Sequence, residues 1–139
     1  MVWFIPSESF VSYKHNLKHI IYGEYVVLVR GKIGSLLNTA AELCEDGEFI
    51  EALKCYDKVL QIDPNNIKAN IDNGVTLQNL GHLNQAIQMY EKVLNSDTEN
   101  IDALINMGSA LHTLGKYADA ISYYDVVLRL EEKNTLALA

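Results

Sequence analysis

The chain has 139 residues, the length of one ordinary domain, and 49% of them are apolar, which excludes a wholly disordered segment. It carries 11 Lys and Arg against 18 Asp and Glu, for a formal net charge of -7. Such a surface repels phosphates and anionic lipid, so we expect neither nucleic acid nor a membrane as partner. The two cysteines, Cys44 and Cys55, are too few for a disulfide framework and predict a reducing compartment, the cytoplasm.

Residues 1–32 form the first region and do not share the repeat that follows. Their apolar residues keep a helical spacing from Phe10 to Ile21, which ends near Gly23. The β-branched run at 25–29 is typical of a strand in isolation, but no second strand is visible to pair with it. We therefore predict a helical N-terminal extension that leads into the first repeat.

From residue 33 onwards the sequence repeats with a period of 34 residues. The segments 33–66, 67–100 and 101–134 align without a gap, and the last two are identical at 13 of 34 positions. Small and large residues line up as two closely crossing helices require. The small columns are Ala40, Gly74 and Gly108, and Ala52, Ala86 and Ala120; the large residues include Tyr56, Tyr90 and Tyr124. A glycine column of Gly47, Gly81 and Gly115 marks a turn at which a left-handed residue closes a helix.

Each half-repeat has the i, i+3, i+4, i+7 apolar spacing of an amphipathic helix. We place the first helices at 34–46, 68–80 and 102–114, and the second helices at 49–62, 83–96 and 117–131. Asp63–Asn66 ends the first repeat with a proline, which cannot continue a helix. The counterparts 97–100 and 131–134 have no proline, so these boundaries are less sharply marked. Residues 135–139 then begin a truncated fourth repeat.

These columns resemble the pattern of the tetratricopeptide repeat family. The matching residues are Asn73-Gly74, Leu80-Gly81, Ala86 and Tyr90 in one repeat and Met107-Gly108, Leu114-Gly115, Ala120 and Tyr124 in the next. The resemblance implies an all-α fold, a right-handed superhelix of helix-turn-helix repeats with a concave groove that binds partner proteins. The aromatic residue usual near the start of the first helix is Leu36, Asn70 or Leu104 here, and we expect Asn70 to loosen one contact between repeats.

The helix period predicts which residues line this groove. Leu37, Ile71 and Ile105 form an apolar row beside a polar row of Asn38, Asp72 and Asn106. Polar side chains of this kind can bond the backbone of an extended peptide while the apolar row contacts its side chains. Alternatively, the apolar row packs within its own repeats and nothing binds there. The predicted peptide-binding residues are Leu37, Asn38, Ala41, Lys68, Ile71, Asp72, Val75, Asp102, Ile105, Asn106 and Ser109.

Some members of the family capture the acidic C-terminus of heat-shock chaperones with Lys, Asn and Arg side chains. The matching positions here are Leu37, Ala41, Asp72, Asp102 and Asn106. None of them is a cation, and two carry the wrong charge. We therefore expect a neutral, apolar or basic peptide instead.

The C-terminal end of the repeats lacks the polar outer helix with which a repeat stack normally finishes. Residues 135–139 are too short to cover Tyr124, Leu128 and Leu130, so apolar surface is expected to stay exposed. Either the natural chain continues, or two copies stack end to end. In the second case the protein is a homo-oligomer that associates through its uncapped C-terminal repeat.

We expect no catalytic residue, no metal site and no cofactor. His15 and His19 have the i, i+4 spacing of two metal ligands, but no Glu follows His15 and no third ligand is evident. No phosphate-binding loop or nucleophile motif occurs. The predicted function is a scaffold or adaptor that binds a peptide or a partner protein. The alternatives are a self-assembling structural unit and a regulatory appendage of a larger enzyme such as a glycosyltransferase.

Overall fold

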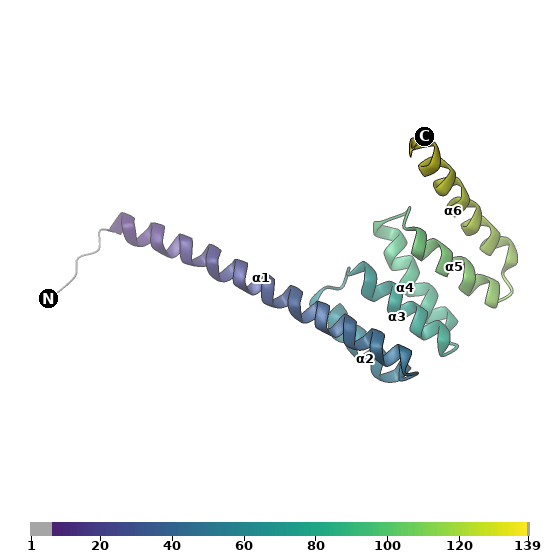
Figure 1. Cartoon of the computed structure of the whole chain (residues 1–139), viewed down its shortest axis with the longest axis horizontal. Helices are drawn as coiled ribbons and strands as arrows, with labels where there is room; N and C mark the ends of the chain where they lie inside the picture. The colour runs from purple at the N-terminus through teal and green to yellow at the C-terminus, as the bar shows by residue number, and fades with distance from the viewer. Residues whose placement is uncertain (1–6, 139) are drawn as a thin grey trace. The chain divides into compact units, whose positions relative to one another are not determined.

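A computed structural model describes the backbone of residues 7–138 and the side chains of residues 18–137. This part of the chain is helical and contains no strand. The helices are α1 (Ser7–Glu45), α2 (Phe49–Ile62), α3 (Ile67–Asn79), α4 (Leu83–Ser96), α5 (Ile101–Thr113) and α6 (Tyr117–Leu138) (Figure 1). The chain divides into two compact units, Met1–Ser35 and Leu36–Ala139, with the boundary inside α1. No helix of the described residues is both long and apolar enough to cross a membrane.

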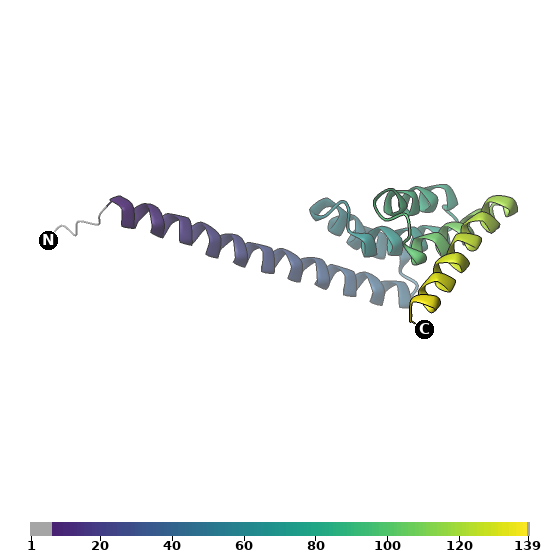
Figure 2. The same ribbon diagram turned by 90° about the horizontal axis from the view of Figure 1, so that it is seen from above.

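The second unit is a row of three helical hairpins. The end of α1 packs on α2, α3 packs on α4, and α5 packs on α6. Neighbouring hairpins meet through α2 and α3 and then through α4 and α5. Figures 1 and 2 show α3 to α6 following one another in chain order. The predicted all-α fold of helix-turn-helix repeats is therefore confirmed.

The turn inside each hairpin depends on the glycine column. Gly47 has φ +79°, and its N–H donates to the carbonyl of Cys44 at 3.1 Å while the N–H of Glu48 donates to that of Leu43 at 2.8 Å. These two bonds form a Schellman motif, which satisfies the last carbonyls of the helix. Gly81 and Gly115 have the same conformation and the same pair of bonds. The left-handed conformation explains why glycine recurs at this column.

The turns between hairpins depend on asparagine. The side-chain oxygens of Asn66 and Asn100 accept the N–H of the residue three positions later, at 2.9 and 3.0 Å, and so cap α3 and α5. Each amide nitrogen also donates to the carboxylate three residues earlier, Asp63 or Asp97, at 3.2 and 3.3 Å. The second boundary therefore closes like the first even though it has no proline.

The third boundary has no turn in the structure, because α6 continues through residues 131–134 to Leu138. The prediction that a helix ends near residue 131 and that another repeat begins at 135 is therefore not what the structure contains. Glu131 occupies the position of Asp63 and Asp97, and glutamate is a good helix former that has no local capping geometry. Residue 139 lies outside the described residues.

The first repeat also differs from the sequence expectation, because its first helix has no start of its own. α1 is a single helix of 39 residues, and the run at 25–29, which is strand-like in isolation, is helical within it. Gly23, Gly31 and Gly34 also lie in this helix, and an added Cβ would meet no atom within 4 Å at any of them. The expectations for residues 1–6 fall outside the described residues.

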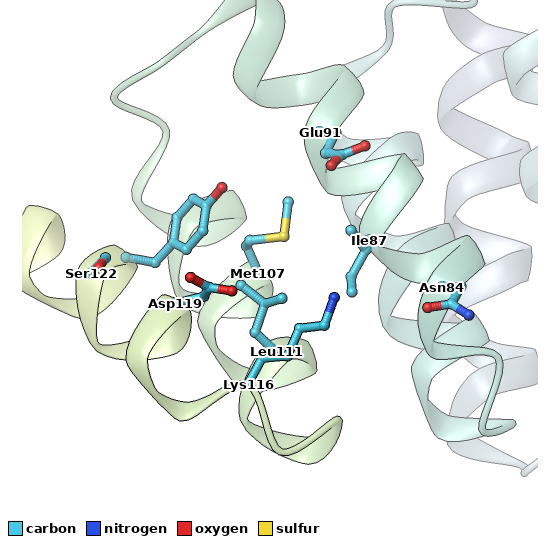
Figure 3. A pocket seen from close by; sticks show the side chains of 9 residues that line it. Asn84, Ile87, Glu91, Met107, Leu111, Lys116, Asp119 and Ser122 are labelled. Atoms are coloured by element: carbon cyan, nitrogen blue, oxygen red, sulfur yellow. The ribbon is translucent and has the colours of Figure 1, made fainter.

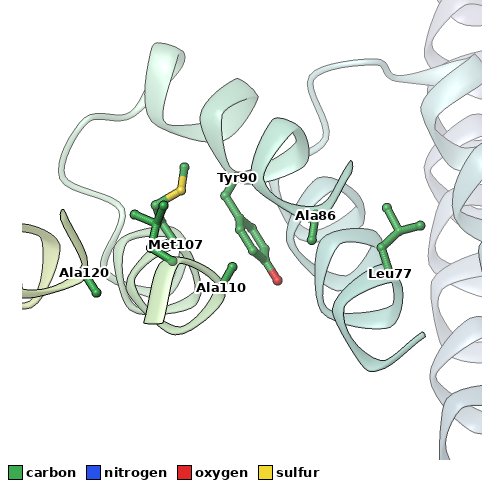
Figure 4. Close-up of a cluster of buried hydrophobic side chains, with 7 residues drawn as sticks. Leu77, Ala86, Tyr90, Met107, Ala110 and Ala120 are labelled. Carbon is green, nitrogen blue, oxygen red and sulfur yellow. The ribbon is translucent and has the colours of Figure 1, made fainter. Parts of the chain in front are cut away.

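The core of the repeats consists of the small and large columns. One cluster of buried side chains, shown in Figure 4, contains Leu77, Ala86, Tyr90, Met107, Ala110, Leu111 and Ala120. The ring of Tyr90 lies against the backbone of Gly74, where an added Cβ would be 2.5 Å from its Cε1 atom. The ring of Tyr124 lies in the same way against Gly108, at 2.6 Å. The small column is therefore required by a close approach of a tyrosine ring to the facing helix.

Asn70 replaces the aromatic residue of the family pattern and is buried. Its amide nitrogen donates to the carbonyls of Pro64 at 3.1 Å and Asn66 at 2.9 Å, so it stabilises the turn between the first two hairpins. Its Oδ1 atom is buried without a hydrogen-bond partner, which costs stability. The loosening predicted at this contact is thus opposed by two bonds that an aromatic residue could not make.

Candidate peptide-binding face

We call the surface formed by the first helices of the repeats, namely α1 from Leu36 onwards, α3 and α5, the inner face. A pocket of about 300 Å³ opens on it between α1 and α3. It is lined by Ala41, Cys44, Tyr56, Lys68, Asp72, Val75, Thr76 and Asn79. The structure therefore brings together four of the residues predicted to bind a peptide, which are Ala41, Lys68, Asp72 and Val75.

The floor of this inner pocket is polar and buried. The Cys44 sulfur lies 3.4 Å from Oγ1 of Thr76 and 3.9 Å from the hydroxyl of Tyr56, and Thr76 donates to the carbonyl of Asp72 at 2.8 Å. Burial, followed by the negative charge of Asp72, raises the pKa of Tyr56. The phenol therefore stays protonated. Tyr56 was not predicted to line the pocket, because the tyrosine column was assigned to the core. Thr76 was not predicted either, and it is buried at the base of the pocket.

The rim of the inner pocket holds an ion pair on the surface of α3. Nζ of Lys68 lies 3.0 Å from Oδ2 of Asp72, and the lysine is the more exposed partner. An exposed i, i+4 pair of this kind is worth only about 0.3–0.5 kcal/mol. A cation from a ligand could therefore replace Lys68 beside Asp72 at little cost.

The second and third hairpins are joined on the inner face by a chain of hydrogen bonds. The hydroxyl of Tyr90 donates to Oε1 of Gln78 at 3.1 Å, and Nε2 of Gln78 donates to Oγ of Ser109 at 3.0 Å. Gln78 occupies the column of Cys44, so in both repeats this position links the core tyrosine to the next first helix. Burial raises the pKa of Tyr90. Ser109, predicted as a groove residue, is half-buried and already bonded.

The three residues of the apolar row predicted for the groove differ in solvent exposure. Ile71 is only 8% exposed and packs in a cluster with Val93 and Ala103. It belongs to the core, so its assignment to the groove is corrected here. Leu37 is half-buried, whereas Ile105 is 41% exposed. Only the third-repeat member of the row presents a large apolar side chain to solvent.

The polar row of the inner face offers hydrogen-bond acceptors to a ligand. Asn38 and Asp102 are exposed, and Asp72 and Asn106 are half-buried. The amide nitrogen of Asn106 donates to the carbonyl of Asp102 at 2.8 Å, which leaves its side-chain oxygen to face a ligand. Carboxylates and amide oxygens accept hydrogen bonds from N–H groups. The row therefore suits the N–H groups and cations of a ligand better than its carboxylates.

Two further pockets, the outer pockets, lie between the second helices of adjacent repeats, and sequence analysis did not predict them. The first, of about 340 Å³, is lined by Leu53, Asp57, Asn73, Leu77, Gln85, Gln88 and Met89. The second, of about 310 Å³ (Figure 3), is lined by Asn84, Ile87, Glu91, Met107, Leu111, Lys116, Asp119, Ser122 and Tyr123. Each residue of the first has its counterpart 34 positions later in the second. The repeat period could have located both.

The residues predicted for self-association differ in exposure. Leu128 is 62% exposed, whereas Leu130 and Tyr124 are half-buried. Three other large residues of α6, Tyr117, Ile121 and Leu136, are 58%, 57% and 70% exposed and were not predicted. The exposed apolar surface of α6 therefore begins at its first residue, Tyr117. Of the three residues predicted for self-association, only Leu128 is fully part of this surface.

The two buried tyrosines predict a loss of stability at high pH. Burial raises the pKa of Tyr56 and Tyr90 above the ordinary value of about 10, so the folded chain holds protons that the unfolded chain releases. The stabilisation is complete below pH 10 and falls as the pH rises through and above it. Urea unfolding across this range is expected to show the decline, and Tyr90→Phe should make it shallower. An unchanged slope would contradict this assignment.

The glycine-closed hairpins, the small columns and the buried tyrosines define a stack of helix-turn-helix repeats. The tetratricopeptide repeat model matches residues 43–98 and 77–139, and the chain belongs to this family. Residues 36–138 thus form the right-handed, all-α solenoid that the resemblance implied. A comparison with curated proteins finds no match.

Solved structures share this fold at low sequence identity. The first repeat domain of Spaghetti (RPAP3), bound to the HSP90 peptide SRMEEVD, is 24% identical with a TM-score of 0.69 over 73% of this chain and 80% of that one. MamA is 20% identical with a TM-score of 0.70 over 74% of this chain and 60% of that one. The Yersinia enterocolitica translocator chaperone SycD, described as an alternative dimer, is 20% identical with a TM-score of 0.67 over 70% and 74%.

Proposed function

We propose that the chain is a non-enzymatic scaffold that binds an extended segment of a partner protein across its inner face. The observation that carries this proposal is the inner pocket, where Asp72 lies at the rim of a cavity between two repeats that is lined by both polar and apolar side chains. Ile105 adds an exposed apolar contact on the third repeat. Because Cys44 and Cys55 are free thiols, we place this activity in a reducing compartment such as the cytoplasm.

The chemistry of the inner face favours a basic segment. Asp72 and Asp102 present carboxylates, and Asn38 and Asn106 present amide oxygens. The lysine that lines the pocket, Lys68, is already paired with Asp72. A Lys or Arg side chain in the pocket would gain a charge-assisted hydrogen bond to Asp72, which is stronger than a neutral one. A neighbouring apolar side chain of the segment would cover Ile105.

The peptide seen with Spaghetti provides a contrast. SRMEEVD contains three acidic side chains, whereas this chain has Asp72 and Asp102 on the inner face and pairs Lys68 with one of them. Like charges at a binding site disfavour the wrong partner. We therefore propose that this chain does not bind SRMEEVD, in spite of the shared fold.

Selection from a library of random extended peptides, followed by calorimetry, tests the proposal. Peptides with Lys or Arg are expected to be enriched, and Asp72→Asn is expected to weaken their binding roughly 2- to 5-fold, because an ion pair at the exposed rim of the pocket is worth up to about 1 kcal/mol. Asp57→Asn is the matched control, since Asp57 lines an outer pocket. Selected peptides that bind Asp72→Asn as well as the unmodified chain, or that are acidic, would contradict the proposal.

A further inference from the structure

The first outer pocket contains a buried asparagine whose side chain has no hydrogen-bond partner. Asn73 on α3 is 5% exposed and lines this pocket. Within the described residues its side-chain amide makes no hydrogen bond. An amide that is removed from water without a partner destabilises the folded chain. The little surface that Asn73 keeps opens into the pocket, where the polar group of a ligand can reach it.

The next repeat shows that packing does not require an asparagine at this position. The residue 34 positions later is Met107, which is 1% exposed and lines the second outer pocket (Figure 3). A methionine therefore fills the equivalent space without leaving a polar group unpaired. Residues that break the rules of packing in natural proteins tend to lie at functional sites. The amide of Asn73 thus indicates a ligand in the first outer pocket.

The charge that lines the first outer pocket is also unpaired. Asp57 on α2 is exposed and forms no ion pair in the part of the chain that the structure describes. The lining of this pocket includes no Lys, Arg or His, whereas Lys116 lines the second outer pocket together with Glu91. A cationic ligand therefore meets a carboxylate in the first outer pocket with no lining cation to compete for it.

The remaining walls of the first outer pocket are mainly apolar. Leu53, Leu77 and Met89 line it together with Gln85 and Gln88 of α4. Leu77 is buried, and Leu53 and Met89 are half-buried. The volume of about 340 Å³ is at the lower end of the range of ligand sites, about 300–1,000 Å³. The pocket therefore suits one long side chain with a polar end better than a large cofactor.

We propose that the first outer pocket binds the guanidinium group of an arginine side chain from a partner protein. A guanidinium group carries five N–H donors in a planar fork, which suits the two acceptors that line this pocket, the carboxylate of Asp57 and Oδ1 of Asn73. The aliphatic stem of the arginine would lie along Leu53 and Met89. A lysine has three donors and a more strongly hydrated charge, and a neutral amide would leave Asp57 unpaired.

The source of the guanidinium group follows from what the pocket lacks. Since no cationic residue lines it, it offers no partner to the carboxylate of free arginine. It therefore recognises the guanidinium end of a side chain. The site is also separate from the inner pocket, because the two pockets have no lining residue in common.

An NMR titration of the full chain with a capped arginine, Nα-acetyl-arginine N-methylamide, tests the proposal. The signals of the Asn73 side-chain amide and the Met89 methyl group are expected to shift at millimolar concentrations of the probe. The equivalent capped lysine should bind at least threefold more weakly. The methyl signal of Met107 in the second outer pocket is expected to stay in place, which makes that pocket an internal control.

Two substitutions identify the acceptors. Asn73→Met inserts the residue of the next repeat and should weaken the capped arginine about tenfold or more, because it removes a buried hydrogen bond to a charged group. The same change should raise the melting temperature, because it removes the unpaired amide. Asp57→Asn should weaken binding roughly 2- to 5-fold, since the carboxylate is exposed. Asp125→Asn is the matched control, because Asp125 is the residue of the same column on α6 and lines neither outer pocket.

Several results would overturn the proposal. They are a Met89 signal that does not shift, equal shifts at Met107, a capped lysine that binds as tightly as the capped arginine, and affinity that neither substitution lowers. Because Asp57 is exposed, Asp57→Asn keeps the fold and decides the question even if Asn73→Met lowers stability. Free arginine that binds tenfold more tightly than the capped form would identify the ligand as the amino acid and would also overturn the proposal.

The result is independent of the peptide proposed for the inner face. Asp72→Asn changes the inner pocket alone and should leave the shifts at Met89 unchanged, whereas Asp57→Asn changes the first outer pocket alone. Failure of one site therefore leaves the test of the other intact.

Discussion

Tyr90→Ala is expected to lower the free energy of unfolding by about 3–5 kcal/mol, the range typical of removing a large buried aromatic side chain. Tyr90 is fully buried, and Figure 4 shows its ring between Ala86 of its own helix and Ala110 of α5. The substitution leaves a cavity at the point where the second and third hairpins meet. Urea unfolding followed by far-UV circular dichroism measures the change.

Two variants separate the reasons for this loss. Tyr90→Phe keeps the ring and removes only the hydroxyl that donates to Gln78, which should cost about 1 kcal/mol. Tyr124→Ala removes the equivalent ring from the last hairpin, where it is half-buried, and should cost less than Tyr90→Ala. If Tyr124→Ala cost as much, the junction between hairpins would not be the source of the stabilisation.

The interior of the array could be predicted because its features recur every 34 residues. The second helices placed at 49–62 and 83–96 have these bounds in the structure. The small columns opposite the tyrosines follow from the same period, since each close approach is repeated. A sequence that repeats with a fixed period indicates packing that repeats with the same period. The bounds of the second helices and the small columns could therefore be predicted from the sequence.

The ends of the array could not be predicted in this way. α1 continues from the first repeat towards the N-terminus, and α6 continues past the expected boundary. A repeat pattern indicates where helices pack but not whether a terminal helix stops, because no neighbouring repeat limits its length. The capping residues were the better signal, since Asp63 and Asp97 precede real turns and Glu131 does not.

The inner face shows how position in the array changes the role of one column. Ile71 and Ile105 occupy equivalent positions, yet Ile71 is 8% exposed and Ile105 is 41% exposed. Ile71 is covered by Ala103 of the following repeat, and the described chain supplies no equivalent cover for Ile105. Amphipathic spacing alone assigned both to the groove. Only the contacts between repeats distinguish them.

Gly74→Ala is expected to destabilise the fold by about 2 kcal/mol, even though alanine is the better helix former by about 1 kcal/mol. An added Cβ would lie 2.5 Å from Cε1 of Tyr90, and the ring is fully buried, so it cannot shift directly into solvent. Forcing extra atoms into a packed core typically costs 1–3 kcal/mol or more. Gly34→Ala is the control, because its Cβ meets no atom within 4 Å and the change should increase helix stability.

A double-mutant cycle attributes the cost of Gly74→Ala to the tyrosine ring. In Tyr90→Leu the ring atoms that meet the new Cβ are absent, so adding Gly74→Ala to that variant should cost little or even stabilise the helix. The expected coupling is at least 1 kcal/mol, in the range found for residues in contact. Gly108→Ala should be milder, because Tyr124 is half-buried and its ring can shift towards solvent. Additive effects of Gly74→Ala and Tyr90→Leu would mean that the glycine is required for a reason other than this contact.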